Sequence, residues 1–295
     1  LGMHAESTSL QNRLMVQIPA CVKKNPRFML DAERAGKRRL AWNNGVFDFT
    51  TKTLLPFSPD IILFFKLSHD YPTTEAARRG VEALVPEVRK RVVDDVWGEN
   101  GDFVLQSTSR SYASDVEDKR YFFVVGDGNS GKGVWVDMNS CAFEGYTGSL
   151  CSKNLLCTNN NSSGDNAKAL SWMVAARHLR LMATSELTVG KGVILDNNTI
   201  KELSSGGDTF CGRQNHKDEM QFRMQGTAWA FANDLPEILN LKTDDATQNR
   251  VVFIEMTRRY LEGEAYEKHK HLPHVLPGDP TIKGWVKQPE VGAAF

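Results

Sequence analysis

The chain has 295 residues, of which 41% are hydrophobic, so it can form a substantial core, and its length favours two domains over one. Basic and acidic residues number 36 each, which excludes a global field that draws the chain to nucleic acid or to an anionic membrane. No apolar run approaches the roughly 18 residues that span a bilayer, and the N-terminus lacks the regions of a signal peptide. We therefore expect a soluble protein without a membrane partner.

The cysteine pattern points to the inside of a cell. Five cysteines occur without a C-x-x-C pair, which argues against both a disulfide framework and a zinc ribbon. We expect reduced thiols in an intracellular, non-secreted protein. Because the chain begins at Leu1 and ends in an apolar run at Phe295, it is expected to be a piece of a longer protein.

The N-terminal third is expected to be helix-rich and carries no catalytic constellation. Basic residues within 1–39 indicate a solvated face, with nucleic-acid contact as the alternative. The Asn-Gly pair within 42–49 predicts a small hairpin, and Thr50 to Lys52 a second turn. One helix is expected from Thr73 or Thr74 through Leu84 and a second from Pro86 to Trp97, the latter with valines at helical spacing. A helix or turn is expected over 103–112.

The most informative stretch is 121–133, where a hydrophobic run ends in a glycine-rich turn. Gly126 and Gly131-Lys132 have the spacing G-x-x-x-x-G-K of a phosphate-binding loop. Such a loop exposes backbone N–H groups to phosphate oxygens and begins a helix whose N-terminus favours negative charge, while the lysine reaches the β- and γ-phosphates. The usual next residue is Ser or Thr, which binds Mg²⁺, but here it is Gly133. The alternative is an ordinary glycine turn with Lys132 as a surface charge.

Two further segments have the order expected of a nucleotide-hydrolysing core. After a helix behind Lys132, a polar loop (158–164) and a helix (166–176), a buried strand over 178–186 ends at Glu186. An acidic residue there can hold Mg²⁺ through water or activate the attacking water, although a surface glutamate is equally consistent with the pattern. A third apolar strand over 227–236 ends at Asn233, which can orient water or sense the γ-phosphate.

Basic residues complete the pattern. A helix over 194–203 contains Lys201, and a hairpin over 209–222 presents a tip with His216 and Lys217 that is either a plain exposed turn or a finger toward a phosphate backbone. Arg250 opens a fourth strand over 248–255, from which it could reach a neighbouring subunit's nucleotide in a ring.

In this order, these motifs resemble the ATPase core of superfamily 3 helicases, AAA+-type ring motors, and in particular the poxvirus-type primase-helicases of large DNA viruses and phages. The likeness runs from about Trp42 to about Glu255. It is carried by the segments Asn44-Gly-Val-Phe-Asp48 with Pro59, Gly126-Asp-Gly-Asn-Ser-Gly-Lys132, Arg180-Leu-Met-Ala-Thr-Ser-Glu186, Lys201-Glu-Leu-Ser-Ser-Gly-Gly-Asp208 with Arg213, Phe231-Ala-Asn-Asp-Leu-Pro236 and Asn249-Arg-Val-Val-Phe253.

The resemblance implies an α/β fold with an AAA+-like P-loop core and a central, mainly parallel sheet, preceded by a small helix-rich N-terminal domain. The expected divisions are 1–98 for the N-terminal or oligomerisation domain, 99–262 for the motor and 263–295 for a C-terminal segment that packs on it. The implied partners are single-stranded or forked DNA, further copies in a homo-hexamer, and a fused or associated primase.

The resemblance also implies a role for each site residue. ATP and Mg²⁺ are the expected cofactors. Lys132, Glu186, Asn233 and Arg250 are the expected catalytic residues, Gly126, Asp127, Gly128, Asn129, Ser130, Gly131, Lys132, Gly133 and Lys201 the nucleotide-binding ones, Arg213, His216 and Lys217 the DNA-binding ones, and Glu186 the metal residue.

Two residues depart from the family pattern and keep other functions open. Gly133 lacks the hydroxyl ligand for Mg²⁺, and Ser185 stands where many such motors have a second acidic residue. Water can fill the coordination sphere of Mg²⁺, which usually retains several waters. The alternatives are a monomeric P-loop kinase of a small molecule or nucleotide, for which no acceptor constellation is visible, and a hydrolysis-deficient ring that binds DNA as a scaffold.

Overall fold

The computed structural model describes residues 25, 27–157, 169–187, 193–214 and 217–295, without the side chains of Ser185 and Glu186. The helices are α3 (Phe28–Gly36), α4 (Glu75–Val88), the π-helix η1 (Arg89–Asp94), α5 (Asp95–Trp97), the 3-10 turn η2 (Gly98–Asn100), α6 (Gly101–Ala113), α7 (Lys132–Phe143), the 3-10 turns η3 (Glu144–Tyr146) and η4 (Ser152–Leu155), α9 (Ser171–Ala176), α10 (Asn197–Leu203), α11 (Asp245–Gln248), α12 (Gly263–His269), α13 (Ile282–Trp285) and α14 (Pro289–Ala294).

The strands form one large sheet and four small ones. They are β1 (Arg39–Trp42), β2 (Gly45–Asp48), β3 (Thr53–Leu55), β4 (Tyr121–Gly126), β5 (Thr147–Ser149), β6 (Leu181–Leu187), β7 (Ile194–Leu195), β8 (Phe210–Gly212), β9 (Met220–Phe222), β10 (Thr227–Ala232), β11 (Glu237–Ile238), β12 (Val251–Met256), β13 (Arg259–Leu261) and β14 (Val275–Pro277). The large sheet has the order β12-β4-β10-β6-β5, and all of its pairings are parallel.

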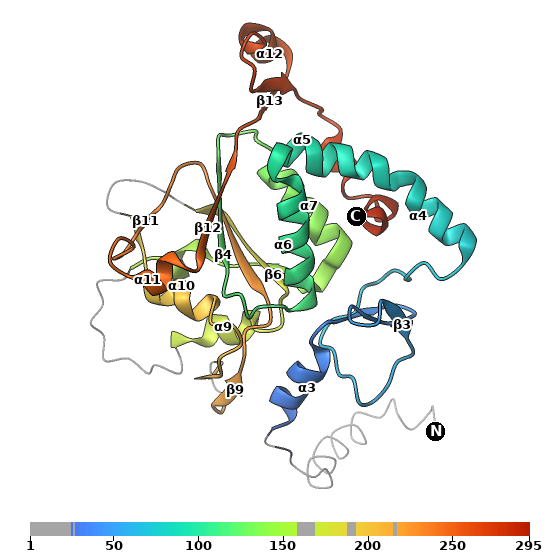
Figure 1. Ribbon diagram of the computed structural model, residues 1–295, viewed down its shortest axis with the longest axis vertical. Coiled ribbons are helices and arrows are strands. Elements are labelled where there is room, and N and C mark those ends of the chain that lie inside the picture. The colour runs from blue at the N-terminus through green and yellow to red at the C-terminus, as the bar shows by residue number, and fades with distance from the viewer. Residues whose placement is uncertain (1–24, 26, 158–168, 188–192, 215–216) are drawn as a thin grey trace, which may run out of the picture.

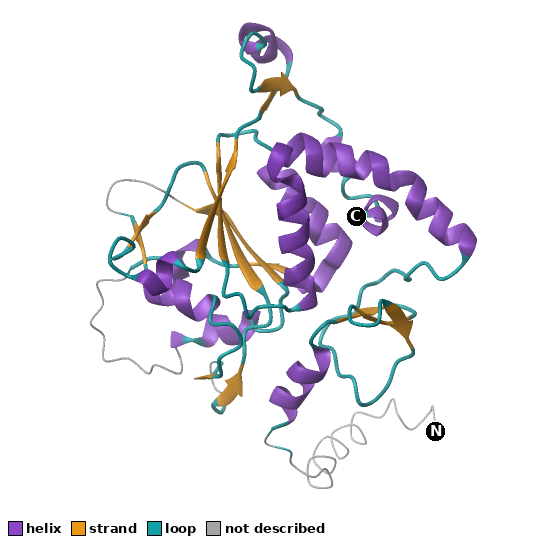
Figure 2. Ribbon diagram, in the orientation of Figure 1, coloured by secondary structure: helices purple, strands orange, loops and turns teal. Residues whose placement is uncertain are grey.

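Helices cover both faces of this sheet (Figures 1 and 2), because its central strands β4 and β10 are apolar and buried on both sides. Along β4, Phe122 and Val124 join the cluster beneath α6 and α7, whereas Tyr121 and Phe123 join the cluster beneath α9 and α10. The predicted α/β class with a parallel central sheet is therefore confirmed. No helix of the described part is both long and apolar enough to cross a membrane.

The N-terminal segments pack on the same core. The hairpin predicted over 42–49 is present, with Trp42 paired to Gly45 across a turn at Asn43 and Asn44, and β3 extends it to three antiparallel strands. Leu40 and Leu67 belong to the hydrophobic cluster that also contains Phe122 of the central sheet. At the other end of the chain, α14 packs against α4 and α7.

Two predicted helices have different boundaries. Pro86 does not begin a second helix but lies inside α4, which continues through η1 into α5. A proline inside a helix costs about 3 kcal/mol. Here the run buries Val88, Val92, Val93 and Val96, and each buried valine contributes roughly 1.5 kcal/mol or more, so tertiary packing outweighs the local signal. The helix predicted over 194–203 begins only at Asn197, because residues 194–195 form β7.

Candidate functional site

The glycine-rich loop lies where β4 ends and α7 begins, as the sequence predicts. We call Gly126–Lys132 the phosphate loop. Asn129 and Gly131 both have left-handed backbones, with φ of 64° and 95°, and these two residues turn the chain from the strand into the helix. The 12-residue α7 starts at Lys132 with Gly131 as its N-cap, so the unpaired N–H groups of its first turn lie at the carboxyl edge of the sheet.

The glycines of the loop differ in whether their surroundings require glycine. A Cβ on Gly126 would lie 2.8 Å from both Cβ and the backbone oxygen of Met256, so β12 approaches too closely for a side chain. Gly131 combines its positive φ with contact to Val96. A Cβ on Gly128 or Gly133 would meet no atom of the described residues within 4 Å, so both positions are open in that part of the structure.

Lys132 and Asn233, predicted from separate motifs, are brought together. Lys132 Nζ donates to Asn233 Oδ1 at 3.0 Å, to the carbonyl oxygen of Asp127 at 2.9 Å and to Ser130 Oγ at 3.4 Å, and it also contacts the Gly126 carbonyl. Burial lowers the pKa of Lys132, and the Asp127 carboxylate opposes this shift. The ammonium group is thus held at the mouth of the loop by neutral oxygens, which a phosphate could replace.

The strand that carries Glu186 is irregular at that residue. Ala230 of β10 pairs with Thr184 of β6, but Ala232 pairs with Leu187, so β6 has one extra residue at Ser185–Glu186. Bulges of this kind change the direction of side chains and are frequent beside active sites. The bulge adjoins the end of β10, directly before Asn233. The side chain of Glu186, the expected catalytic and metal residue, lies outside the described atoms.

Arg250 and Lys201 lie at the other end of the sheet. Arg250 precedes β12, and its main-chain oxygen accepts from Tyr121 at the start of β4. Its Nη1 donates to the Ala246 carbonyl at 2.6 Å and its Nε lies 3.4 Å from the Ser204 oxygen. The length of β12, about 17 Å at 3.3 Å per residue, separates this end from the phosphate loop. Within one chain, Arg250 therefore does not join Lys132.

Lys201 has a partner of its own. Its Nζ lies 2.9 Å from Asp244 Oδ2, which also accepts from Asn197 and from the Thr247 hydroxyl. The Lys201 hydrogen bond is the main cause that holds the pKa of Asp244 well below its usual range. The lysine expected to bind nucleotide thus belongs, within one subunit, to a polar cluster between α10 and α11.

The predicted hairpin is present as the antiparallel pair β8 and β9. Lys217 lies at its exposed tip, and Arg213 follows β8 with a partially exposed side chain. His216 lies outside the described residues. Arg223, which follows β9, donates from Nε to the Thr209 hydroxyl at 3.0 Å and so ties the base of the hairpin together.

Sequence reasoning missed Arg258 and Tyr260, which follow β12 at the same edge as the phosphate loop. The backbone N–H of Tyr260 donates to the Asn129 carbonyl at 2.9 Å. Their position in the sequence, directly after a predicted strand, could have indicated them, because residues that follow parallel strands gather at the edge of the sheet where ligands bind.

The residues fit a nucleotide phosphate better than a protein-bound metal. The open Gly133, the exposed helix N-terminus and Lys132 suit an anion. Within the described part of the chain, no three His, Cys, Asp or Glu side chains are grouped as metal ligands. A magnesium ion would here be held by the substrate's phosphates and water, with Glu186 as the candidate residue of the chain.

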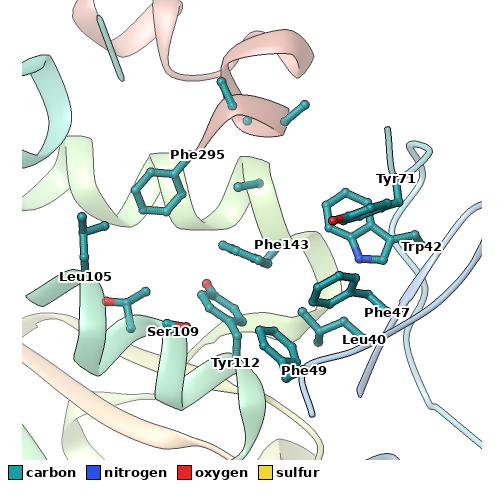
Figure 3. Close-up of a pocket in the computed structure, with 15 residues that line it drawn as sticks. Leu40, Trp42, Phe47, Phe49, Tyr71, Leu105, Ser109, Tyr112, Phe143 and Phe295 are labelled. Atoms are coloured by element: carbon teal, nitrogen blue, oxygen red, sulfur yellow. The ribbon is translucent and has the colours of Figure 1, made fainter. Parts of the chain in front are cut away.

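A cavity of about 400 Å³ lies elsewhere, between β1, β2, α6, α7 and the chain's last residues (Figure 3). Aromatic side chains, among them Trp42, Tyr71 and Phe143, surround it, and its lining contains neither a charged residue nor any residue of the phosphate loop. It therefore supplies none of the charges that a triphosphate needs.

The sequence matches no known protein family and no curated protein. Among solved structures, the chain is similar to the apo C-terminal region of NrS-1, with a TM-score of 0.47 and 12% identity over 71% of this chain and 44% of that one. It is also similar to a JCV helicase with a bound thiazolopyridine phenoxyphenyl acetamide, with a TM-score of 0.41 and 10% identity over 72% of this chain and 53% of that one. The chain thus spans about half the length of these structures.

Proposed function

We propose that the chain is the core of an ATP-driven DNA helicase that assembles as a ring, a homo-hexamer with a nucleotide between adjacent subunits. The observation that carries the proposal is the contact between Lys132 and Asn233 at the mouth of the phosphate loop, beside the bulge at Glu186. Three motifs on three strands thereby converge on one edge, as a nucleotide-hydrolysing site requires.

The position of Arg250 supports a shared site. Arg250 lies a full strand length from Lys132 of the same chain, so it can stabilise transition-state charge only in a neighbour's site. In a ring each subunit contributes its loop to one interface and its Arg250 to the other. Lys201, on the same end of the sheet, would be the second charge from that neighbour.

DNA is the proposed track. The hairpin tip with the exposed Lys217 would face the channel, where a closed ring repeats one lysine and concentrates positive potential although the chain is neutral overall. Binding should therefore weaken with salt, since each lysine that neutralises a phosphate releases counterions. Each ATP hydrolysed would move the tips along one enclosed strand.

The test is ATP hydrolysis with and without single-stranded DNA, with Lys132→Ala, Arg250→Ala and mixtures of the two. Each variant alone should be inactive. In a 1:1 mixture, interfaces that join an intact loop to an intact Arg250 form again, so up to about a quarter of the wild-type rate should return. If the mixture stays inactive, catalysis across the interface is refuted.

Gly133 favours one second candidate, a ring that binds ATP and DNA without turnover. The position lacks the hydroxyl that usually binds Mg²⁺, and no atom of the described residues lies within 4 Å of a Cβ built there. Saturable ATP binding with no hydrolysis in the presence of DNA would identify this scaffold, whereas a strict monomer that phosphorylates a small molecule would contradict both readings.

A further inference from the structure

Three segments that are far apart in the sequence meet around the phosphate loop. One is the loop itself, the second is the stretch 257–261 after β12, and the third is the end of the long helical run formed by α4, η1 and α5. The contacts are made by Val96, Arg258 and Tyr260, which lie outside the sequence motifs. These contacts fix two backbone positions of the loop.

The first fixed position is Asn129. A residue other than glycine with φ of 64° adopts a sparsely populated conformation, which persists only where its surroundings hold it. The Tyr260 N–H donates to the Asn129 carbonyl at 2.9 Å, so the left-handed turn is tied to β13.

The second fixed position is Gly131. The side chain of Val96, in α5, packs against it, and a Cβ at Gly131 would lie 3.1 Å from Val96 Cγ1. Val96 itself is buried. The end of the helical run therefore supports Gly131, the N-cap of α7, and with it the direction of the helix's first N–H groups.

Arg258 joins these two supports to each other. Its Nη1 donates to the carbonyl oxygens of Asp94 and Asp95 at 2.6 and 2.8 Å, and the Tyr260 hydroxyl also donates to the Asp95 carbonyl. These carbonyls lie near the C-terminal end of the run, where the helix dipole favours a cation. Burial raises the pKa of Tyr260, which keeps its hydroxyl protonated as a donor.

We infer that Arg258 and Tyr260 are positioning residues that hold the phosphate loop in its nucleotide-accepting shape. They do so by locking β13, which binds Asn129, to the end of α5, which packs against Gly131. The effect on affinity rests on the proposed function, in which the loop binds a nucleotide. A loop that is already ordered binds phosphate without the entropic cost of ordering it. Neither residue needs to touch the nucleotide.

The test compares Arg258→Met, Arg258→Lys and Tyr260→Phe for affinity toward a fluorescent ATP analogue and for the rate at saturating ATP. Arg258→Met should weaken affinity about ten-fold, because two charge-assisted hydrogen bonds disappear, and Tyr260→Phe about three-fold. Arg258→Lys should recover part of the affinity, since an ammonium can still reach a carbonyl. The saturating rate should change less than the affinity.

Arg91→Met is the matched control. Arg91 lies on the same helical run, pairs with Asp279 and stacks 4.1 Å over the Trp285 ring, so its loss weakens the run away from the loop. It should leave affinity unchanged. Equal affinities of wild type and Arg258→Met would overturn the inference, as would an equal loss in Arg91→Met.

A second readout separates this inference from the proposed function. Hydrogen exchange of the loop amides 127–131 without nucleotide should accelerate in Arg258→Met but not in Arg91→Met. If the wild type binds no ATP, the proposed function fails, but the exchange result still decides whether Arg258 holds the phosphate loop in place. If the wild type binds ATP and exchange is unchanged in Arg258→Met, the inference alone fails.

Discussion

Replacing Gly133 with serine should strengthen the dependence of nucleotide binding on magnesium. Gly133 is the second residue of α7, and a Cβ there meets no described atom within 4 Å, so we expect a serine to be accommodated. The exchange should stabilise the helix by at most about 0.5 kcal/mol, which raises the melting temperature by about 1 °C in a chain of this size. A hydroxyl ligand in place of one water should add about 1 kcal/mol to metal binding, or about a five-fold lower half-saturating Mg²⁺ concentration.

The assay is a Mg²⁺ titration of ATP-analogue binding and of hydrolysis, with Gly133→Ala as the control. Alanine gives the helix a similar or larger gain but supplies no oxygen, so it should raise the melting temperature without moving the Mg²⁺ midpoint. The reasoning is refuted if alanine and serine shift the midpoint equally. A loss of stability in Gly133→Ser would instead show that the position is not open.

Three further outcomes are expected. Gly126→Ala should destabilise the fold by about 1–3 kcal/mol in urea unfolding, because its Cβ meets the Met256 backbone, whereas Gly128→Ala should have little effect; equal costs would be inconsistent with this packing. Burial raises the pKa of Glu33 to about 7, above its unfolded value near 4.5, so the stability it contributes is complete below pH 4.5 and lost as the pH rises through 7; Glu33→Gln should flatten that part of a pH-dependent melting curve. Asn233→Leu should lower the hydrolysis rate at least about ten-fold while ATP affinity changes little, as steady-state kinetics beside direct binding can measure.

The strand, loop and helix around Lys132 could be predicted because their signals are local. A hydrophobic run, glycines at fixed spacing and a following apolar helix lie within about 25 residues. The meeting of Lys132 and Asn233 was also predictable, since both follow parallel strands and such ends share one edge. The register between β6 and β10 could not be predicted, because the extra residue of β6 at Ser185–Glu186 depends on pairing with a strand more than 40 residues later.

The remaining features depend on partners that sequence spacing does not specify. β5 has only Thr147 to Ser149 and includes a glycine, and it becomes a strand because β6 pairs with it. Lys201 could be recognised as a candidate cation, but its ion pair with Asp244 arises from the packing of α10 on α11. In the same way Arg258 acquires its contacts only when the helical run returns to the sheet's edge.

The two ends of the central sheet divide the chemistry between them. The carboxyl end holds the phosphate loop, Asn233 and, after β12, Arg258 and Arg259; Nη1 of Arg258 is bound to helix carbonyls. The amino end holds Arg250, which donates to two backbone carbonyls, and Lys201, which donates to Asp244. In the proposed function, transfer of a phosphoryl group concentrates negative charge at the loop, more than the single charge of Lys132 can neutralise. Because β12 separates the two sets by about 17 Å, Arg250 could supply charge to the loop only from another chain, so in the proposed ring assembly and catalysis are expected to fail together.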